Sequence, residues 1–174
     1  MNSILSDLGV NVIGLDQFPE IKDIAETGTT LIENALIKAR TVHKITGLPS
    51  LADDTGLEVD VLDGAPGVYS ARFAGENPTF EDNVNKMLTA LGGIPDDKRT
   101  ARFRTALAFV DSNSELCEEG VIEGKITEKP RGEDGFGYAP IFEQANETKT
   151  LAETANEEKN RISHRARALE KMQK

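Results

Sequence analysis

The spacing of apolar residues predicts four helical segments. Between residues 31 and 46 the apolar side chains recur every three or four positions and share one face, which is typical of an amphipathic helix. Thr30-Leu31-Ile32-Glu33 has the capping-box pattern at the start of this helix, and Gly47 follows its end. Comparable start or stop signals occur elsewhere, and the predicted helices cover residues 2–8, 30–46, 79–91 and 154–171.

Other segments alternate apolar and polar residues, which is the pattern of half-buried strands. The predicted strands cover residues 10–15, 48–52, 57–61, 102–110 and 116–127. The last two are separated by Asp111-Ser112-Asn113-Ser114, a spacing that predicts a hairpin. Helices that alternate with strands, together with a hairpin, predict an α/β protein with a mixed β-sheet flanked by helices. Because no repeat or low-complexity linker interrupts the pattern, residues 1–174 are interpreted as one domain.

Two adjacent acids follow the predicted strand at 48–52. In Ser50-Leu51-Ala52-Asp53-Asp54-Thr55-Gly56 a short apolar run ends in two carboxylates and a glycine. A buried unpaired charge is costly, and ligands of open α/β sheets bind at the carboxyl ends of strands. Magnesium takes one or two protein carboxylates and fills its other positions with water and phosphate oxygens. The pattern therefore predicts a Mg²⁺–phosphate site, and a solvated turn with two ordinary acids is an equal alternative.

The same residues contain Asp54-Thr55-Gly56, the three-residue motif of aspartic proteases. That chemistry needs two such carboxylates that share a proton, held in a mostly β fold. This chain has one copy of the motif and several predicted helices. A homodimer could supply the second carboxylate, but the helical segments argue against a protease.

Composition narrows the classes of function. Hydrophobic residues make up 38% of the chain and charged residues 29%, which is typical of a soluble globular protein. The net charge of −10 disfavours binding to a nucleic-acid polymer, although a metal or a local basic pocket can still attract a small anion. One cysteine and two histidines exclude an internal disulfide and a Cys/His zinc cluster. The chain has no apolar run of membrane-spanning length and no signal-peptide pattern, so a cytoplasmic protein without a membrane partner is expected.

A glycine-rich segment carries two aromatic residues. In Gly135-Phe136-Gly137-Tyr138 the two rings are two positions apart, so an extended backbone would point them to the same side. Glycine between them would let a flat ligand approach the backbone, and aromatic faces stack on nucleobases. The alternative, equally compatible with the sequence, is a pair of core residues beside a tight turn.

The last predicted helix is rich in basic residues. Ile162 and Leu169 are spaced for one buried stripe, and Arg165 falls within that stripe. An arginine there needs an anion or another acceptor for its guanidinium. Together with Lys159 and His164 it could bind a phosphate or the carbonyl of a base. On the residue pattern alone, a basic surface helix with solvated side-chain ends is the favoured interpretation.

Taken in order, these segments resemble one known family, the pyrophosphatases of non-standard purine nucleoside triphosphates, or inosine triphosphatase family. Each motif is weak by itself, but their order along nearly the whole chain is specific. The motifs are Glu26-Thr27-Gly28-Thr29-Thr30, Glu33-Asn34-Ala35-Leu36-Ile37-Lys38-Ala39-Arg40, Leu51-Ala52-Asp53-Asp54-Thr55-Gly56-Leu57, Gly64-Ala65-Pro66-Gly67-Val68-Tyr69-Ser70-Ala71-Arg72, Gly135-Phe136-Gly137-Tyr138, Glu158-Lys159 and Ser163-His164-Arg165.

The resemblance implies a fold, an activity and partners. It implies an elongated α/β fold with two lobes around a nucleotide cleft, usually as a homodimer. It implies Mg²⁺-dependent hydrolysis of ITP, dITP and XTP to the monophosphate and pyrophosphate, which removes deaminated purines from the nucleotide pool. The only other partner it implies is the small-molecule nucleotide.

The resemblance also implies roles at the phosphate end of the substrate. Asp54 would be the general base and a metal ligand, and Glu26 a second acid of the metal site. Glu33 and Asp53 are further candidate ligands of the metal. In chemical terms, Mg²⁺ and Lys38 could neutralise a polyphosphate while a carboxylate positions or deprotonates the attacking water.

At the base end, the resemblance implies that Phe136 and Tyr138 sandwich the purine. Selectivity for a 6-keto purine needs donors at that oxygen, which Arg165 and backbone amides of the Phe136 loop could supply; a 6-amino group would face the same donors and be rejected. The expected substrate-binding residues are Thr55, Lys38, Phe136, Gly137, Tyr138, Ala139, Lys159, His164 and Arg165.

Two departures from the family pattern lead to a second hypothesis. The family begins with a strand and a Ser/Thr-x-Asn-x-x-Lys loop that cradles the triphosphate, and Met1 aligns partway into the helix that follows. The family sequence Phe-Gly-Tyr-Asp-Pro also reads Phe136-Gly137-Tyr138-Ala139-Pro140 here. The sequence is thus interpreted as an N-terminally short domain, and the alternative function is a nucleotide-binding remnant with weak or no turnover. A related enzyme for modified pyrimidine nucleotides is a third possibility, which the Phe136 and Arg165 motifs disfavour.

Overall fold

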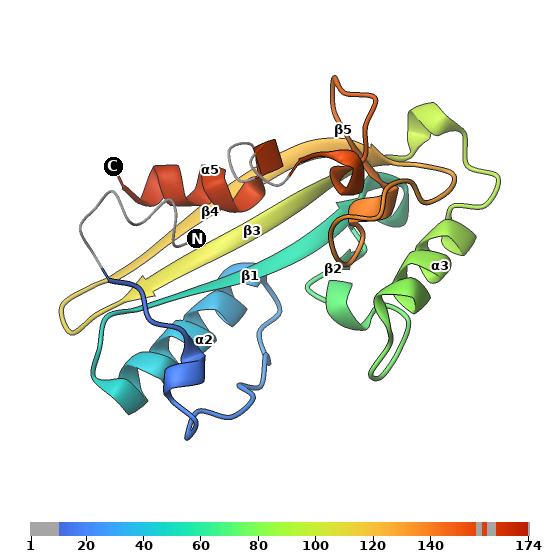
Figure 1. Ribbon diagram of the computed structural model, residues 1–174. Helices are drawn as coiled ribbons and strands as arrows, with labels where there is room; N and C mark the ends of the chain where they lie inside the picture. Colours follow the sequence, from blue (N-terminus) through green and yellow to red (C-terminus); the bar gives the residue numbers. More distant parts are fainter. Residues whose placement is uncertain (1–10, 156–157, 160–162, 174) are drawn as a thin grey trace.

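The computed structural model describes residues 11–155, 158–159 and 163–173 of the chain. Its centre is a five-stranded sheet in the order β2-β1-β3-β4-β5. The strands are β1 (Ser50–Val59), β2 (Pro66–Gly67), β3 (Thr100–Val110), β4 (Glu115–Ile126) and β5 (Phe142–Gln144). The helices are α2 (Leu31–Thr46), α3 (Phe80–Ala90) and α5 (His164–Met172). In Figure 1, α2 and α5 lie on opposite sides of the long strands, and α3 lies at the other end of the sheet.

The strand β1 separates two packing layers because its side chains alternate between the two faces of the sheet. Ala52 packs against α2 in a cluster that includes Ala35 and Ala39. Its neighbour Leu51 packs on the opposite side against Leu169 of α5. Even-numbered residues in this part of β1 therefore face α2, and odd-numbered residues face α5.

A third and larger apolar cluster holds the far end of the sheet. It joins Leu57 and Val59 of β1 to Met87 of α3, to Tyr138 of the glycine-rich segment and to Phe142 of β5. The structure thus has two ends: α2 and α5 cover one, and α3 with the loops around β2 and β5 covers the other (Figure 1). The expected α/β architecture of helices flanking an elongated sheet is confirmed.

The capping box and the terminal glycine in the sequence correctly predicted where α2 begins and ends. The Thr30 hydroxyl accepts the Glu33 amide, and the Glu33 carboxylate accepts the Thr30 amide, which completes the predicted capping box. Gly47 ends the helix with a φ of 68°, a value that favours glycine. The predicted helix at 79–91 and the predicted hairpin are also confirmed, with boundaries within two residues.

Three expectations about the strands were wrong. The predicted strands 48–52 and 57–61 are one strand, because β1 runs through the acid pair and continues past Gly56. Every pairing between described strands is antiparallel, so the expected mixed sheet is not observed in this part of the chain. Residues 11–14 form no strand, and a 3₁₀ turn follows at Leu15–Gln17. Residues 2–8 and the start of the predicted strand at 10–15 lie outside the described residues.

The final predicted helix is interrupted. Glu158 and Lys159 are helical, but Ser163 has an extended backbone and its hydroxyl accepts the Ala166 amide, which starts α5 as a separate helix. A serine cap inside the predicted helical stretch explains the break. Part of the first turn of the helix predicted at 154–171 lies outside the described residues. None of the helices that the structure describes is long and apolar enough to cross a bilayer.

Close approach of α5 to the sheet requires a glycine in β4. A Cβ added to Gly120 would overlap the carbonyl oxygen of His164 and stand 2.6 Å from the amide nitrogen of Ala168. We predict that Gly120→Ala lowers the free energy of unfolding by about 1–3 kcal/mol, since α5 must move away from the strand. Urea unfolding measures this change. The control Leu116→Ala alters an exposed side chain of the same strand and should change stability less; equal effects would contradict the packing argument.

Candidate functional site

Asp54 is held on the α2 side of β1 by two donors from one helix. Its Oδ1 accepts a hydrogen bond from the Lys38 ammonium at 2.9 Å, and its Oδ2 accepts one from the Asn34 amide at 3.1 Å. Asn34 and Lys38 are four residues apart, so they lie on the same face of α2. Asn34 is fully buried and its own Oδ1 accepts the Gly28 amide, which ties the preceding loop to the helix. The sequence analysis did not single out Asn34, although its spacing from Lys38 could have indicated it.

Lys38 also joins Asp54 to Glu26. The Lys38 Nζ donates to Glu26 Oε1 at 2.8 Å, so one ammonium lies between two carboxylates. Burial opposes the charged form of Lys38, but the bonds to Glu26 and Asp54 outweigh it and raise the Lys38 pKa. Burial raises the pKa of Asp54, and the Lys38 ammonium and Asn34 amide only partly offset this effect. We call Glu26, Asn34, Lys38 and Asp54 the acid cluster.

The acid cluster suits a divalent cation. Two carboxylates and one ammonium leave a net negative charge, and Mg²⁺ needs only one or two carboxylates when a phosphate supplies the other oxygens. Within the described residues, no three His, Cys, Asp or Glu side chains gather closely enough to hold a metal by themselves. A cation at Asp54 and Glu26 would therefore depend on oxygens from substrate and water.

The other two predicted metal ligands face elsewhere. Asp53 points to the α5 side of β1, where its Oδ2 accepts from Arg165 Nε at 2.7 Å. Adjacent strand residues point to opposite faces, so Asp53 and Asp54 do not converge on one cation as the predicted Mg²⁺–phosphate site implied. The Glu33 carboxylate accepts hydrogen bonds from Thr29 and Thr30. Those from Thr29 are the main reason that the Glu33 pKa is lowered. Glu33 thus serves the helix cap.

Thr55 lies on the same side of β1 as Asp53. Its hydroxyl is hydrogen-bonded to that of Thr105, the residue opposite it in β3. β3 pairs with β1 along one edge. Along the opposite edge, within the described residues, only Leu57 and Glu58 have a strand partner, which is β2. A ligand at the remaining edge could therefore reach Asp54 on one face and Asp53 with Arg165 on the other.

The two aromatic residues of the glycine-rich segment separate. Phe136 is 66% exposed, whereas Tyr138 is buried and its hydroxyl donates to the Ser70 carbonyl at 2.9 Å. Positive φ angles at Gly135 and Gly137, 120° and 61°, turn the backbone, so the extended geometry that would align the two rings is absent. The structure therefore does not bring the Phe136 and Tyr138 rings together as a sandwich, and their roles toward a base stay a prediction. Ala139 is buried next to Tyr138 and starts a 3₁₀ turn over Ala139–Ile141.

Ser70 joins this segment to β1. Its hydroxyl accepts the Leu57 amide at 2.8 Å, and its carbonyl accepts the Tyr138 hydroxyl. Leu57 is three residues beyond Asp54 on β1, which corresponds to about 10 Å along the strand. The Phe136 segment is thus tied, through Tyr138 and Ser70, to the same strand that carries Asp54.

Two of the predicted site residues near the C-terminus, His164 and Lys159, contact different parts of the structure. His164 is buried, and its ring stacks on Phe103 with centroids 5.2 Å apart. Neither ring nitrogen has a hydrogen-bond partner among the described residues. Burial, assisted by Arg165 and opposed by Asp53, lowers the His164 pKa to about 4. The Lys159 ammonium lies beside the glycine-rich segment, 3.9 Å from where a Cβ of Gly135 would stand.

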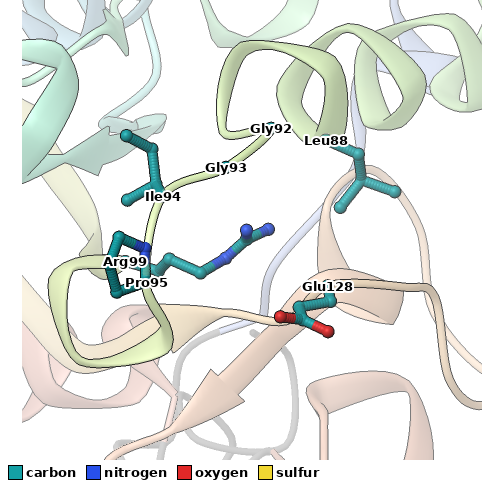
Figure 2. Close-up of a pocket in the computed structure, with 7 residues that line it drawn as sticks. All are labelled: Leu88, Gly92, Gly93, Ile94, Pro95, Arg99 and Glu128. Atoms are coloured by element: carbon teal, nitrogen blue, oxygen red, sulfur yellow. The ribbon is translucent and has the colours of Figure 1, made fainter.

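A separate cavity of about 380 Å³ contains none of the predicted site residues (Figure 2). Its lining residues are Leu88, Gly92, Gly93, Ile94, Pro95, Arg99 and Glu128. The Arg99 guanidinium is buried there and donates to the carbonyls of Leu91, Ile126 and Thr127. These bonds tie the end of α3 to the end of β4, which explains why a buried arginine is needed at this position.

This α/β protein brings two carboxylates, Glu26 and Asp54, to one lysine and leaves the Phe136 ring exposed. Carboxylates gathered in this way are groups that a metal-assisted phosphate site can use. The chain belongs to the Ham1 family, whose model matches residues 1–174.

Relatives and solved structures agree with this family. A Vibrio cholerae protein named dITP/XTP pyrophosphatase is 49% identical over 99% of this chain and 87% of its own length. One of the same name from Thermoanaerobacter pseudethanolicus is 52% identical over 97% of this chain and 80% of its own length. The structure of a HAM1 protein from Coxiella burnetii is 45% identical, with a TM-score of 0.90 over 98% of this chain and 88% of that one.

The buried, neutral His164 predicts a pH dependence of stability. The unfolded chain binds a proton at this histidine near pH 6.5, whereas the folded protein resists protonation down to about pH 4. The folded state therefore loses stability as the pH falls, by about 2 kcal/mol between pH 7 and pH 5 from this residue. Urea unfolding at the two pH values measures the loss. His164→Phe keeps a ring against Phe103 and should lose less stability over this interval; an unchanged pH dependence would contradict the assignment.

Proposed function

We propose that this chain hydrolyses the deaminated purine nucleotides dITP, ITP and XTP to the monophosphate and pyrophosphate. The observation that carries the proposal is the acid cluster, in which a carboxyl of raised pKa is oriented by an ammonium and an amide. The names of relatives about half identical to this chain, dITP/XTP pyrophosphatase, support the choice of substrate.

The proposed reaction uses Asp54 as the general base. A water oxygen attacks the α-phosphorus, Asp54 accepts the proton, and the bond from the α-phosphorus to the bridging oxygen breaks so that pyrophosphate leaves. The raised pKa makes Asp54 a better proton acceptor than an ordinary aspartate, as general-base catalysis requires. Lys38 is close enough to Asp54 to contact a phosphate oxygen beside it.

A divalent cation completes the proposed site. Asp54 and Glu26 are the residues that would hold Mg²⁺, with Glu33 and Asp53 directed to other partners. Bound there, Mg²⁺ would neutralise charge on the phosphate chain and on the leaving pyrophosphate. Removal of the cation with EDTA should abolish pyrophosphate release, and added Mg²⁺ should restore it.

Recognition of the purine is assigned to the α5 side of β1. Asp53 holds Arg165 through Nε, which orients its planar guanidinium so that the remaining donors could reach a 6-keto oxygen. His164 and Lys159 border the same region, and Phe136 offers an exposed face for stacking. A 6-amino group, as in ATP, would place donors against these donors, so the group at position 6 separates ATP from 6-keto purines.

We further propose that the protein works as a cytoplasmic homodimer, as the family resemblance implies. Light scattering coupled to size-exclusion chromatography should give twice the chain mass of 18.9 kDa. A monomer at assay concentrations would contradict this assignment.

Asp54→Asn should lower kcat for ITP by at least about 100-fold, since the amide cannot accept the proton. A pyrophosphate-release assay measures the loss, and circular dichroism should show an unchanged fold. Asp60→Asn is the matched control, because Asp60 is an exposed aspartate engaged by Thr100 and Arg102. If Asp54→Asn retains the wild-type rate, Asp54 is not the base.

A substrate panel tests the proposed function against its alternatives. Wild-type protein with Mg²⁺ should release pyrophosphate from ITP and XTP much faster than from dUTP or methylated UTP. The opposite order would identify a pyrimidine enzyme. Binding of ITP without any turnover would identify the nucleotide-binding remnant.

A further inference from the structure

Two phenylalanine rings are far more exposed than an apolar side chain normally requires. Phe80 is 61% exposed and Phe136 66%, the two largest values among the large apolar residues that the structure describes. Burying a phenylalanine ring is favourable by about 1.5–3 kcal/mol, so two open rings side by side forgo a substantial gain. Their exposure is explained if a ligand covers them.

The two rings come from different parts of the chain and lie next to each other. Phe80 is the first residue of α3, whereas Phe136 belongs to the glycine-rich segment. Their centroids are 6.3 Å apart and their planes are tilted by 43°. A flat ring contacted on both faces needs planes separated by about 7–8 Å, because carbon atoms in contact are about 3.5–4 Å apart. The observed pair would therefore admit a base after separating by about 1 Å and rotating toward parallel.

The backbone at Phe80 is well anchored, so this opening requires mainly side-chain rotation. Thr79 and Asp82 form a capping box at the start of α3. Asn83 accepts the Ala74 amide and donates to the Ala71 carbonyl, which ties the helix to the preceding segment. The Lys159 ammonium beside Gly135 places a polar group near the same segment.

We propose that Phe80 stacks on the face of the purine opposite Phe136, so that the base enters between the two rings. The inference rests on the proposed function and replaces the second ring of the expected sandwich, since Tyr138 is buried with its hydroxyl bonded to Ser70. Phe80 is thus a base-stacking residue from the end of the molecule that α3 covers.

The chain contains no tryptophan, which permits a direct test of this contact. Phe80→Trp introduces a single indole at the proposed position. Its emission should fall on titration with inosine 5′-monophosphate and reach a plateau, because the base stacks on the indole. Ribose 5-phosphate, which lacks the base, should leave the emission unchanged. Leu116→Trp places the indole at an exposed position of β4 and should not respond to either compound.

Kinetics supply the second measurement. Phe80→Leu should raise the KM for ITP by about 5- to 150-fold, the range expected for loss of one stacking contact, with a smaller change in kcat. Glu81→Ala, an exposed change in the same helical turn, should leave KM unaltered.

The outcomes separate the two proposals. If wild-type protein releases no pyrophosphate from ITP or XTP, the proposed function fails. If wild-type protein is active, but Phe80→Leu keeps the wild-type KM and the Phe80→Trp emission ignores inosine monophosphate, the base does not enter between the rings and only this inference is overturned.

Discussion

Two neighbouring carboxylates in the middle of a strand must each find a cation on a different face of the sheet. Asp54 meets Lys38 on the α2 side, and Asp53 meets Arg165 on the α5 side. An aspartate buried without such a partner would carry a large desolvation cost. The alternation of side chains in β1 therefore determines which helix must lie on each side and which basic residue each helix presents.

This constraint also gives the two faces different roles. The α2 face gathers Glu26 and Asp54 around one ammonium, which suits a cation and a phosphate chain. The α5 face holds Arg165 against Asp53 and the His164 ring against Phe103. Under the proposed function, phosphate chemistry and base recognition would lie on opposite sides of a single strand, and a substrate at its edge would contact both.

Sequence reasoning predicted the elements whose signals are local. The capping box at Thr30 and Glu33 defined α2, and the spacing of apolar residues defined α3 and the long hairpin. It failed where tertiary contacts determine the length and the pairing of the strands. Residues 53–56 were predicted to separate two strands, whereas β1 runs through them. At Gly56, β2 packs so closely that a Cβ would stand 2.6 Å from the Gly67 carbonyl oxygen. The antiparallel arrangement of β1 and β3 depends on a long connection that carries no local signal.

The candidate site was also predicted only in part, because some of its contacts follow from local sequence spacing and others from tertiary contacts. Asp54, Glu26 and Lys38 come together, because motif spacing on a helix and a strand carries over to three dimensions. The rings of Phe136 and Tyr138 do not come together, because Gly135 and Gly137 have positive φ angles and turn a segment that was predicted to be extended. Phe80 could not be found from sequence, since its importance lies in a ring 56 residues away in the chain that happens to face it.

Ser70 has a consequence for how the parts of the molecule move together. One residue accepts the amide of Leu57 through its side chain and the phenol of Tyr138 through its backbone. A displacement of the glycine-rich segment would pull on this junction and be passed along the same backbone that carries Asp54. Through Ser70, the segment that carries Phe136 and the strand that carries Asp54 are in this way mechanically coupled.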